Sequence, residues 1–128
     1  MSRNTIVCVC TVPVLALTCA GVGATTYYVD IDAAGGAGTD WASAFGDLQD
    51  ALDVATSGDE IWVAEGVYVP SDPTTPGENR TKTFTLLDGV EIYGGFVGDE
   101  SSVPERNIEL YETILSGDLG SNDDPGFP

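Results

Sequence analysis

A change in the spacing of apolar residues at Gly58 constrains the fold of this chain most strongly. Before Gly58, the apolar residues of segment 44–55 recur along one face of a helix, and acidic residues occupy the opposite face. After Gly58, short apolar stretches follow the twofold period of β-strands, at 61–63, 84–86, 90–92 and 113–115. An alternating segment at 26–31 predicts a strand ahead of the helix. The sequence therefore predicts one amphipathic helix lying across several short strands.

The predicted strands recur at a nearly constant interval. Phe84 follows Ile61 by 23 residues, and Ile114 follows Ile92 by 22. An interval of this size is typical of one coil of a solenoid, whose repeats span roughly 20–45 residues. The interval favours successive coils of a solenoid over a compact antiparallel sheet.

Asp88 and Gly89 leave an alternative open. This pair is a strong signal for a type I′ hairpin between antiparallel strands, and it also suits a corner between successive strands of a coil. The repeat interval favours the corner. A small antiparallel sheet with one covering helix remains the competing interpretation.

Residues 1–24 have the order of a secretory signal peptide: an early Arg3, an apolar run, and small residues before an expected cleavage after Ala24. The apolar run is interrupted by Pro13 and is shorter than the roughly 20 residues that span a bilayer. We therefore expect a secreted or cell-surface protein whose mature domain is residues 25–128. The cysteines all fall in the predicted signal, so no disulfide is expected in the mature domain: Cys8, Cys10 and Cys19.

The predicted mature domain is strongly acidic and lacks histidine. All 21 Asp and Glu residues follow position 24, against three cations, which leaves a net charge of −18. Such a charge repels phosphates and anionic lipid, so neither nucleic acid binding nor membrane insertion after signal removal is expected. Without histidine or mature cysteine, the chain has no Ser-His-Asp or Cys-His nucleophile and no ordinary zinc site.

Two candidate sites remain. Calcium is the one cofactor considered, because hard oxygen ligands cluster near the C-terminus, at Asp118, Asn122, Asp123 and Asp124. Their spacing differs from an EF-hand loop, and a plain acidic loop is the alternative. Trp62, on the outward side of its predicted strand, is a candidate carbohydrate contact, because aromatic rings stack on sugars.

Two runs of the sequence resemble a known family. Residues 41–52, WASAFGDLQDAL, and residues 57–68, SGDEIWVAEGVY, are similar to the N-terminal cap and first coil of right-handed parallel β-helix proteins of the pectin-lyase-like superfamily. Residues 89–96 and 113–118 resemble the next coils of exported bacterial members. The resemblance implies a mainly β fold, a right-handed parallel β-helix (solenoid) with an N-terminal capping α-helix. No cap follows residue 118, so a truncated fragment is expected.

The family includes polysaccharide lyases and hydrolases as well as surface adhesins. Their catalytic residues lie on coils beyond the region matched here, so the resemblance assigns no catalytic residue to this chain. We expect an exported, non-catalytic surface or adhesive scaffold whose partners are polysaccharide or cell-surface components. The alternative is the N-terminal part of a polysaccharide lyase or glycoside hydrolase whose active site lies beyond this chain.

Overall fold

The computed structural model describes residues 23–119. The predicted signal peptide lies outside the described residues except for its last two positions, so it stays a prediction. Within residues 23–119 no helix has the length and apolar character needed to cross a membrane.

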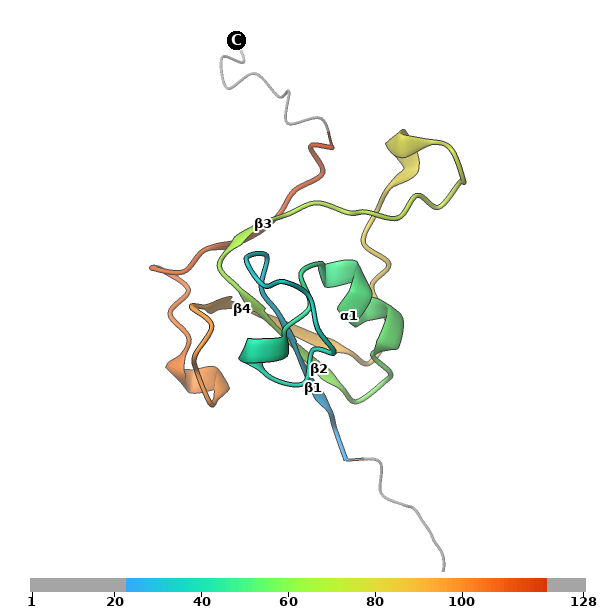
Figure 1. The fold of residues 1–128 in the computed structure, drawn as a ribbon. Helices are drawn as coiled ribbons and strands as arrows, with labels where there is room; N and C mark the ends of the chain where they lie inside the picture. The colour runs from blue at the N-terminus through green and yellow to red at the C-terminus, as the bar shows by residue number, and fades with distance from the viewer. Residues whose placement is uncertain (1–22, 120–128) are drawn as a thin grey trace, which may run out of the picture.

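Within residues 23–119, five short strands of three to six residues form two parallel sheets. Figure 1 shows how these strands are arranged. The larger sheet has the order β1-β2-β4, and the smaller pairs β3 with β5. In each pair, a crossover connection separates the two strands in sequence, as parallel pairing requires. The strand bounds are β1 Thr26–Val29, β2 Glu60–Ala64, β3 Gly66–Tyr68, β4 Glu91–Phe96 and β5 Thr113–Leu115.

The helix α1 (Leu48–Val54) begins later than the sequence predicts. Asp47 is its N-cap, and its carboxylate accepts a hydrogen bond from the Gln49 N–H. Phe45, expected in the first turn, is extended instead. Its N–H donates to the Tyr28 carbonyl at 2.8 Å, and its own carbonyl accepts from the Asp30 N–H. The predicted helix start was therefore wrong because this backbone pairs with β1.

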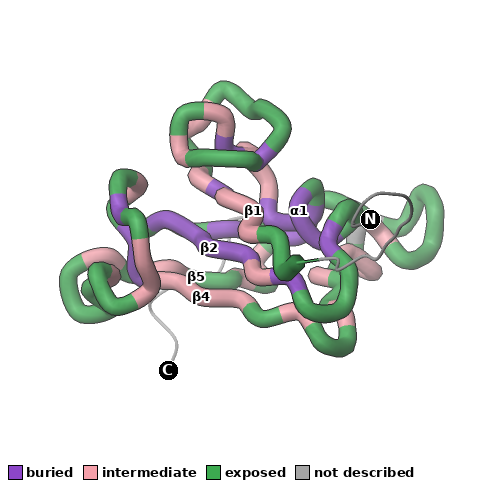
Figure 2. Tube along the Cα trace, turned by 90° about the horizontal axis from the view of Figure 1, so that it is seen from below, coloured by how far each residue is buried: buried purple, intermediate pink, exposed green. Residues whose placement is uncertain are grey.

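The core lies between α1 and the larger sheet. Leu48, Ala51 and Leu52 of the helix pack against Val29 of β1 and Ile61 of β2, and all five are buried. Figure 2 shows that burial is greatest along β2 and one face of α1, whereas β1 and the middle of β4 are half-buried and β5 is mostly exposed. The apolar interior is thus centred on β2 and α1, and Tyr27 of β1 and Ile92 of β4 are partly buried at its two sides.

The prediction of a right-handed parallel β-helix is wrong for residues 23–119. The two sheets are small and do not close into coils. The physical reason lies in segment 84–86, where the predicted strand does not form. The Thr85 N–H donates to the side chain of Gln49 on α1 at 3.3 Å, Leu86 is 63% exposed, and the chain from β3 to β4 projects as a loop. Without that strand, the regular interval does not correspond to a repeated coil.

The antiparallel alternative is also wrong. All pairs of named strands are parallel, and the antiparallel pairing that the structure records within residues 23–119 is an isolated bridge between Pro73 and Lys82. Asp88 and Gly89 form a turn that leads into β4, and Gly89 has a φ of 84° that suits glycine. This pair therefore does not make a hairpin.

Candidate functional site

The segment 106–113 folds back over the second half of β4 and forms a pocket there. The Asn107 N–H donates to the Gly95 carbonyl at 2.8 Å, and the Gly95 N–H donates to the Thr113 hydroxyl oxygen at 3.0 Å. Glycine is needed at this approach, because a Cβ on Gly95 would lie 2.7 Å from a methyl carbon of Ile108. The pocket has a volume of about 180 Å³ and is lined by Gly94, Gly95, Arg106, Ile108, Tyr111, Glu112 and Thr113.

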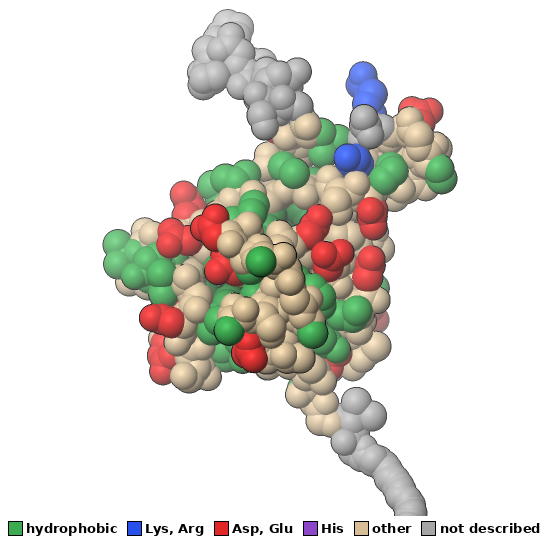
Figure 3. Space-filling model, viewed as in Figure 1, with side chains coloured by type: hydrophobic (Ala, Val, Ile, Leu, Met, Phe, Trp, Pro, Cys, Tyr) green, Lys and Arg blue, Asp and Glu red, His purple; other side chains and the backbone are tan. Residues whose placement is uncertain are grey.

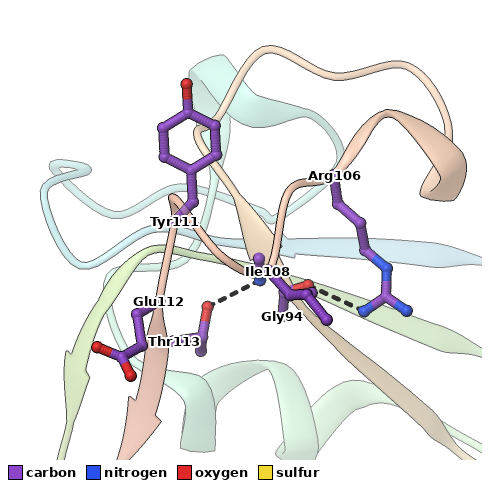
Figure 4. A pocket seen from close by; sticks show the side chains of 7 residues that line it. Gly94, Arg106, Ile108, Tyr111, Glu112 and Thr113 are labelled. Carbon is purple, nitrogen blue, oxygen red and sulfur yellow. Dashed lines mark hydrogen bonds between the residues drawn. The ribbon is translucent and has the colours of Figure 1, made fainter.

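Arg106 is the cation of this pocket. Its guanidinium donates to the Gly94 carbonyl at 3.1 Å and lies 5.3 Å from the centre of the Tyr93 ring. Figure 4 shows the side chains of Arg106, Tyr111 and Glu112 extending away from one another. The lining thus offers one guanidinium to an anionic group, while its acidic and phenolic groups do not converge on a common point.

Trp62 lies in an aromatic cluster on the face of the larger sheet opposite α1. Its ring stacks on Phe96, with centroids 5.0 Å apart and an interplanar angle of 6°, and meets Tyr28 edge-on at 5.5 Å. Its indole N–H donates to the Glu60 carboxylate at 2.9 Å. Trp41 packs on the other side of Tyr28 and on Phe96.

This packing leaves Trp62 only 6% exposed. The ring points outward from its strand as the alternation indicates, but its neighbours cover it. Carbohydrate contact by Trp62 therefore stays a prediction, and it requires the covering rings of Tyr28 or Phe96 to move.

Glu100 is a buried carboxylate that organises a turn. Its two oxygens accept hydrogen bonds from the backbone N–H groups of Val97, Gly98 and Asp99 at 2.7–3.0 Å. Burial raises the pKa of Glu100, but these N–H groups together outweigh burial and hold the pKa below its ordinary value. The Glu100 carbonyl in turn accepts from the Trp41 indole N–H at 2.9 Å, which ties the turn to the aromatic cluster.

Asp59 has a similar role at the start of β2. One carboxylate oxygen accepts from the Thr25 N–H at 3.0 Å, and the other accepts from the Thr56 N–H and hydroxyl. The Thr25 and Thr56 N–H groups lower the pKa of Asp59. The carboxylate thereby connects the chain before β1 to the end of α1.

Tyr68 places a phenol inside the molecule. Only 2% exposed, it accepts a hydrogen bond from the Ile31 N–H and donates one to the Ala64 carbonyl. Burial raises the pKa of Tyr68 to about 12. Like Glu100 and Asp59, this perturbed group is bonded to main-chain atoms.

The four calcium candidates are not brought together within the described residues. Asp118 is described, and its N–H donates to the Ser116 hydroxyl oxygen at 3.1 Å. Asn122, Asp123 and Asp124 lie outside residues 23–119. Over the described range no three acidic side chains are arranged to hold a metal ion. Calcium binding stays a prediction.

Sequence reasoning missed both Glu100 and the 106–113 pocket. The adjacent Gly94 and Gly95 were the available signal, because glycine at the end of a strand often marks the close approach of another segment. The approaching segment, 106–113, is brought to Gly95 by long-range folding, and the spacing of residues along the chain does not identify that segment.

Comparisons of this chain with family models, with curated proteins and with solved structures gave no match in any of the three. The residues of the chain itself therefore support the functional proposals below.

Proposed function

We propose that this chain is an exported, non-catalytic module that serves as a surface or adhesive scaffold. One observation carries the proposal. Three of the groups with shifted pKa values, Glu100, Asp59 and Tyr68, are each bonded to main-chain atoms that fix the fold. A catalytic acid or base must instead reach the substrate with a free proton-transfer position. These three groups are best explained as supports for a rigid body.

The surface charge supports the same role. Red acidic side chains are spread over the face seen in Figure 3, whereas the blue cationic atoms in that view stand on the projecting loop between β3 and β4. A net charge of −18 after the predicted signal keeps an exported protein soluble and directs it toward cationic or neutral partners.

A second candidate is the N-terminal part of a polysaccharide lyase or glycoside hydrolase whose active site lies beyond this chain. The favouring observation is Arg106 at the pocket on β4, because a guanidinium binds the carboxylate of an acidic sugar well. In that case this chain would hold substrate but would not cleave it.

The test uses the purified chain with pectin and with alginate, each with and without millimolar calcium. Release of unsaturated uronate ends and of new reducing ends is measured, and affinity electrophoresis through gels containing the same polymers measures binding. We expect no turnover above that of heat-unfolded protein. Measurable turnover would contradict the scaffold proposal. Retardation that Arg106→Ala abolishes, without turnover, would favour the second candidate.

A further inference from the structure

The two outer edges of the larger sheet are covered differently. The free edge of β1 is paired with a returning segment of chain. The Tyr28 N–H donates to the Gly38 carbonyl at 2.9 Å, the Phe45 N–H donates to the Tyr28 carbonyl, and the Asp30 N–H donates to the Phe45 carbonyl. The β1 edge is therefore closed to another strand.

Main-chain bonds cover the outer edge of β4 in its second half, and the Arg106 guanidinium also lies 5.3 Å from the centre of the Tyr93 ring. Gly94 and Gly95 are bonded to Arg106, Asn107 and Thr113. Beside the first half, no strand of residues 23–119 lies on the outer side. We call this first half, residues 91–93, the β4 edge.

The backbone of Ile92 points outward from the β4 edge. The Glu91 N–H donates to the Asp59 carbonyl in the parallel ladder with β2. Backbone groups of alternate residues in a parallel ladder point to opposite sides, so the N–H and C=O of Ile92 face away from β2. An unpaired edge of this kind is a template for a further strand.

The side chains of the sheet form continuous columns that end at this edge. Tyr27, Ile61 and Ile92 are register partners on the inner face. Ile61 is fully buried, and Ile92, which packs against the same core, is only partly buried. An aliphatic residue beside Ile92 would complete this column.

The outer face continues in the same way. Tyr28, Trp62 and Tyr93 are register partners. An aromatic residue beside Tyr93 would extend that column, because aromatic cross-strand pairs are favourable.

The charges at the start of the strands define the third feature of the partner. Glu60 and Glu91 are register partners, so two carboxylates lie opposite each other on one face. Like charges directly opposite are unfavourable, and a cation in the next position of this column would be favourable. The net charge of −18 adds to the attraction for a basic segment and opposes pairing with a second copy of the same acidic chain.

We propose that the β4 edge binds an extended segment of a partner protein by parallel strand addition. The segment has a Lys or Arg beside Glu91, an aliphatic residue beside Ile92 and an aromatic residue beside Tyr93. Main-chain bonds to Ile92 supply affinity, and the three side-chain columns supply selectivity. This inference names the partner of the proposed scaffold and rests on that proposed function.

The probe is the blocked peptide acetyl-Thr-Lys-Ile-Tyr-Val-Thr-amide, titrated into the purified chain by calorimetry. In the parallel register the tyrosine N–H of the peptide donates to the Ile92 carbonyl. Methylating that one nitrogen removes the donor, and we expect the dissociation constant to rise by up to about tenfold. Absence of binding by the parent peptide, or equal binding by the methylated peptide, overturns the proposal.

A charge exchange tests the position of the basic residue. Replacing the lysine of the peptide by glutamate is expected to weaken binding about threefold to tenfold, and Glu91→Lys is expected to reverse this preference. Glu109→Lys, at an exposed position outside the β4 edge, is the matched control and should keep the original preference. A preference that Glu91→Lys leaves unchanged, or that Glu109→Lys reverses equally, overturns the proposal.

Two further results separate the possible failures. Sedimentation that shows a dimer in the absence of peptide, lost in Ile92→Lys, would assign the β4 edge to a second copy and overturn the partner-segment proposal. Uronate turnover by a chain that still binds the peptide would contradict the non-catalytic function alone, and peptide binding would still support the strand-addition site. Failure of peptide binding without turnover would overturn this inference alone.

Discussion

The Tyr68 hydroxyl accepts a hydrogen bond from the Ile31 N–H at 3.1 Å, and so connects β3 to the chain that follows β1. The same hydroxyl donates to the Ala64 carbonyl at 3.0 Å. One buried phenol thereby satisfies a donor and an acceptor of two separate segments. This bridge holds the smaller sheet against the larger one.

Tyr68→Phe is expected to destabilise the protein by about 1–3 kcal/mol, because it leaves the Ile31 N–H without its partner and removes one of the hydrogen bonds to the Ala64 carbonyl, which keeps the Thr113 hydroxyl. The free energy of unfolding in urea measures the effect. Tyr111→Phe, at a partly exposed position, is the control and should cost less than about 0.5 kcal/mol. Equal costs for the two substitutions would show that the Tyr68 bridge contributes nothing specific.

The same residue predicts a loss of stability in alkali. The pKa of Tyr68 is about 12 in the folded protein, because the phenol is buried, against an ordinary value of 10.0. Between these values the unfolded chain loses the proton and the folded chain keeps it, so stability falls as the pH rises through this range. The difference in the free energy of unfolding between wild type and Tyr68→Phe should be smaller at a pH between the two pKa values than at neutral pH. A difference that is constant with pH would contradict this assignment.

Glu100 predicts the opposite dependence in acid. The backbone N–H groups of Val97, Gly98 and Asp99 overcome burial and lower its folded pKa, so its contribution is present above the ordinary value of 4.5 and is lost as the pH falls through the folded pKa. Glu100→Gln should cost about 1–3 kcal/mol at neutral pH and progressively less below pH 4.5. Urea unfolding across this range provides the measurement. A cost that does not shrink in acid would mean that the charge of Glu100 is unimportant.

Gly95→Ala should disturb the fold of segment 106–113. Gly95 has a φ of 91°, and an added Cβ would lie 2.7 Å from Ile108. Gly77→Ala is a matched control, because Gly77 has a φ of 87° but an open surrounding. Both should lose roughly 1 kcal/mol of unfolding free energy to backbone strain, and Gly95→Ala should lose more. Similar losses would contradict the close approach at Gly95.

Replacing one of two opposed carboxylates should stabilise the larger sheet. Glu60 and Glu91 are register partners on one face, and Glu91→Lys converts a repulsive pair into an attractive one. The expected gain is about 0.2–1 kcal/mol in the free energy of unfolding, largest at low salt. Because Glu91→Lys also removes the hydrogen bond that the Glu91 carboxylate accepts from the Tyr93 hydroxyl, the comparison is made in the Tyr93→Phe background. Unchanged or reduced stability there at low salt would show that the two carboxylates do not interact.

Local patterns predicted much of the secondary structure. The segments 61–63, 90–92 and 113–115 fall within or overlap β2, β4 and β5, although β2 is buried on both faces and β5 is mostly exposed. Segment 84–86 has the same alternation but bonds to Gln49 of α1 instead of another strand. Its partner is distant in sequence, so the pattern could not distinguish the two outcomes.

The site depended still more on long-range contacts. Alternation placed Trp62 on the outer face, but the rings that cover it come from Tyr28 and Phe96 on neighbouring strands. Segment 106–113 returns to β4 through main-chain bonds that involve Asn107 and Gly95, and such bonds have no local sequence signature. Composition could exclude histidine chemistry, but it could not locate a pocket.

Residue-by-residue amide hydrogen exchange by NMR tests most directly whether the outer side of β4 is open at residues 91–93. The N–H groups of Glu91 and Tyr93 face β2, whereas the N–H of Ile92 faces outward. We predict that the Ile92 amide exchanges roughly a hundredfold faster than the Tyr93 amide in the isolated chain. Equal protection of Ile92 and Tyr93 would mean that the edge is already covered, and would contradict the claim.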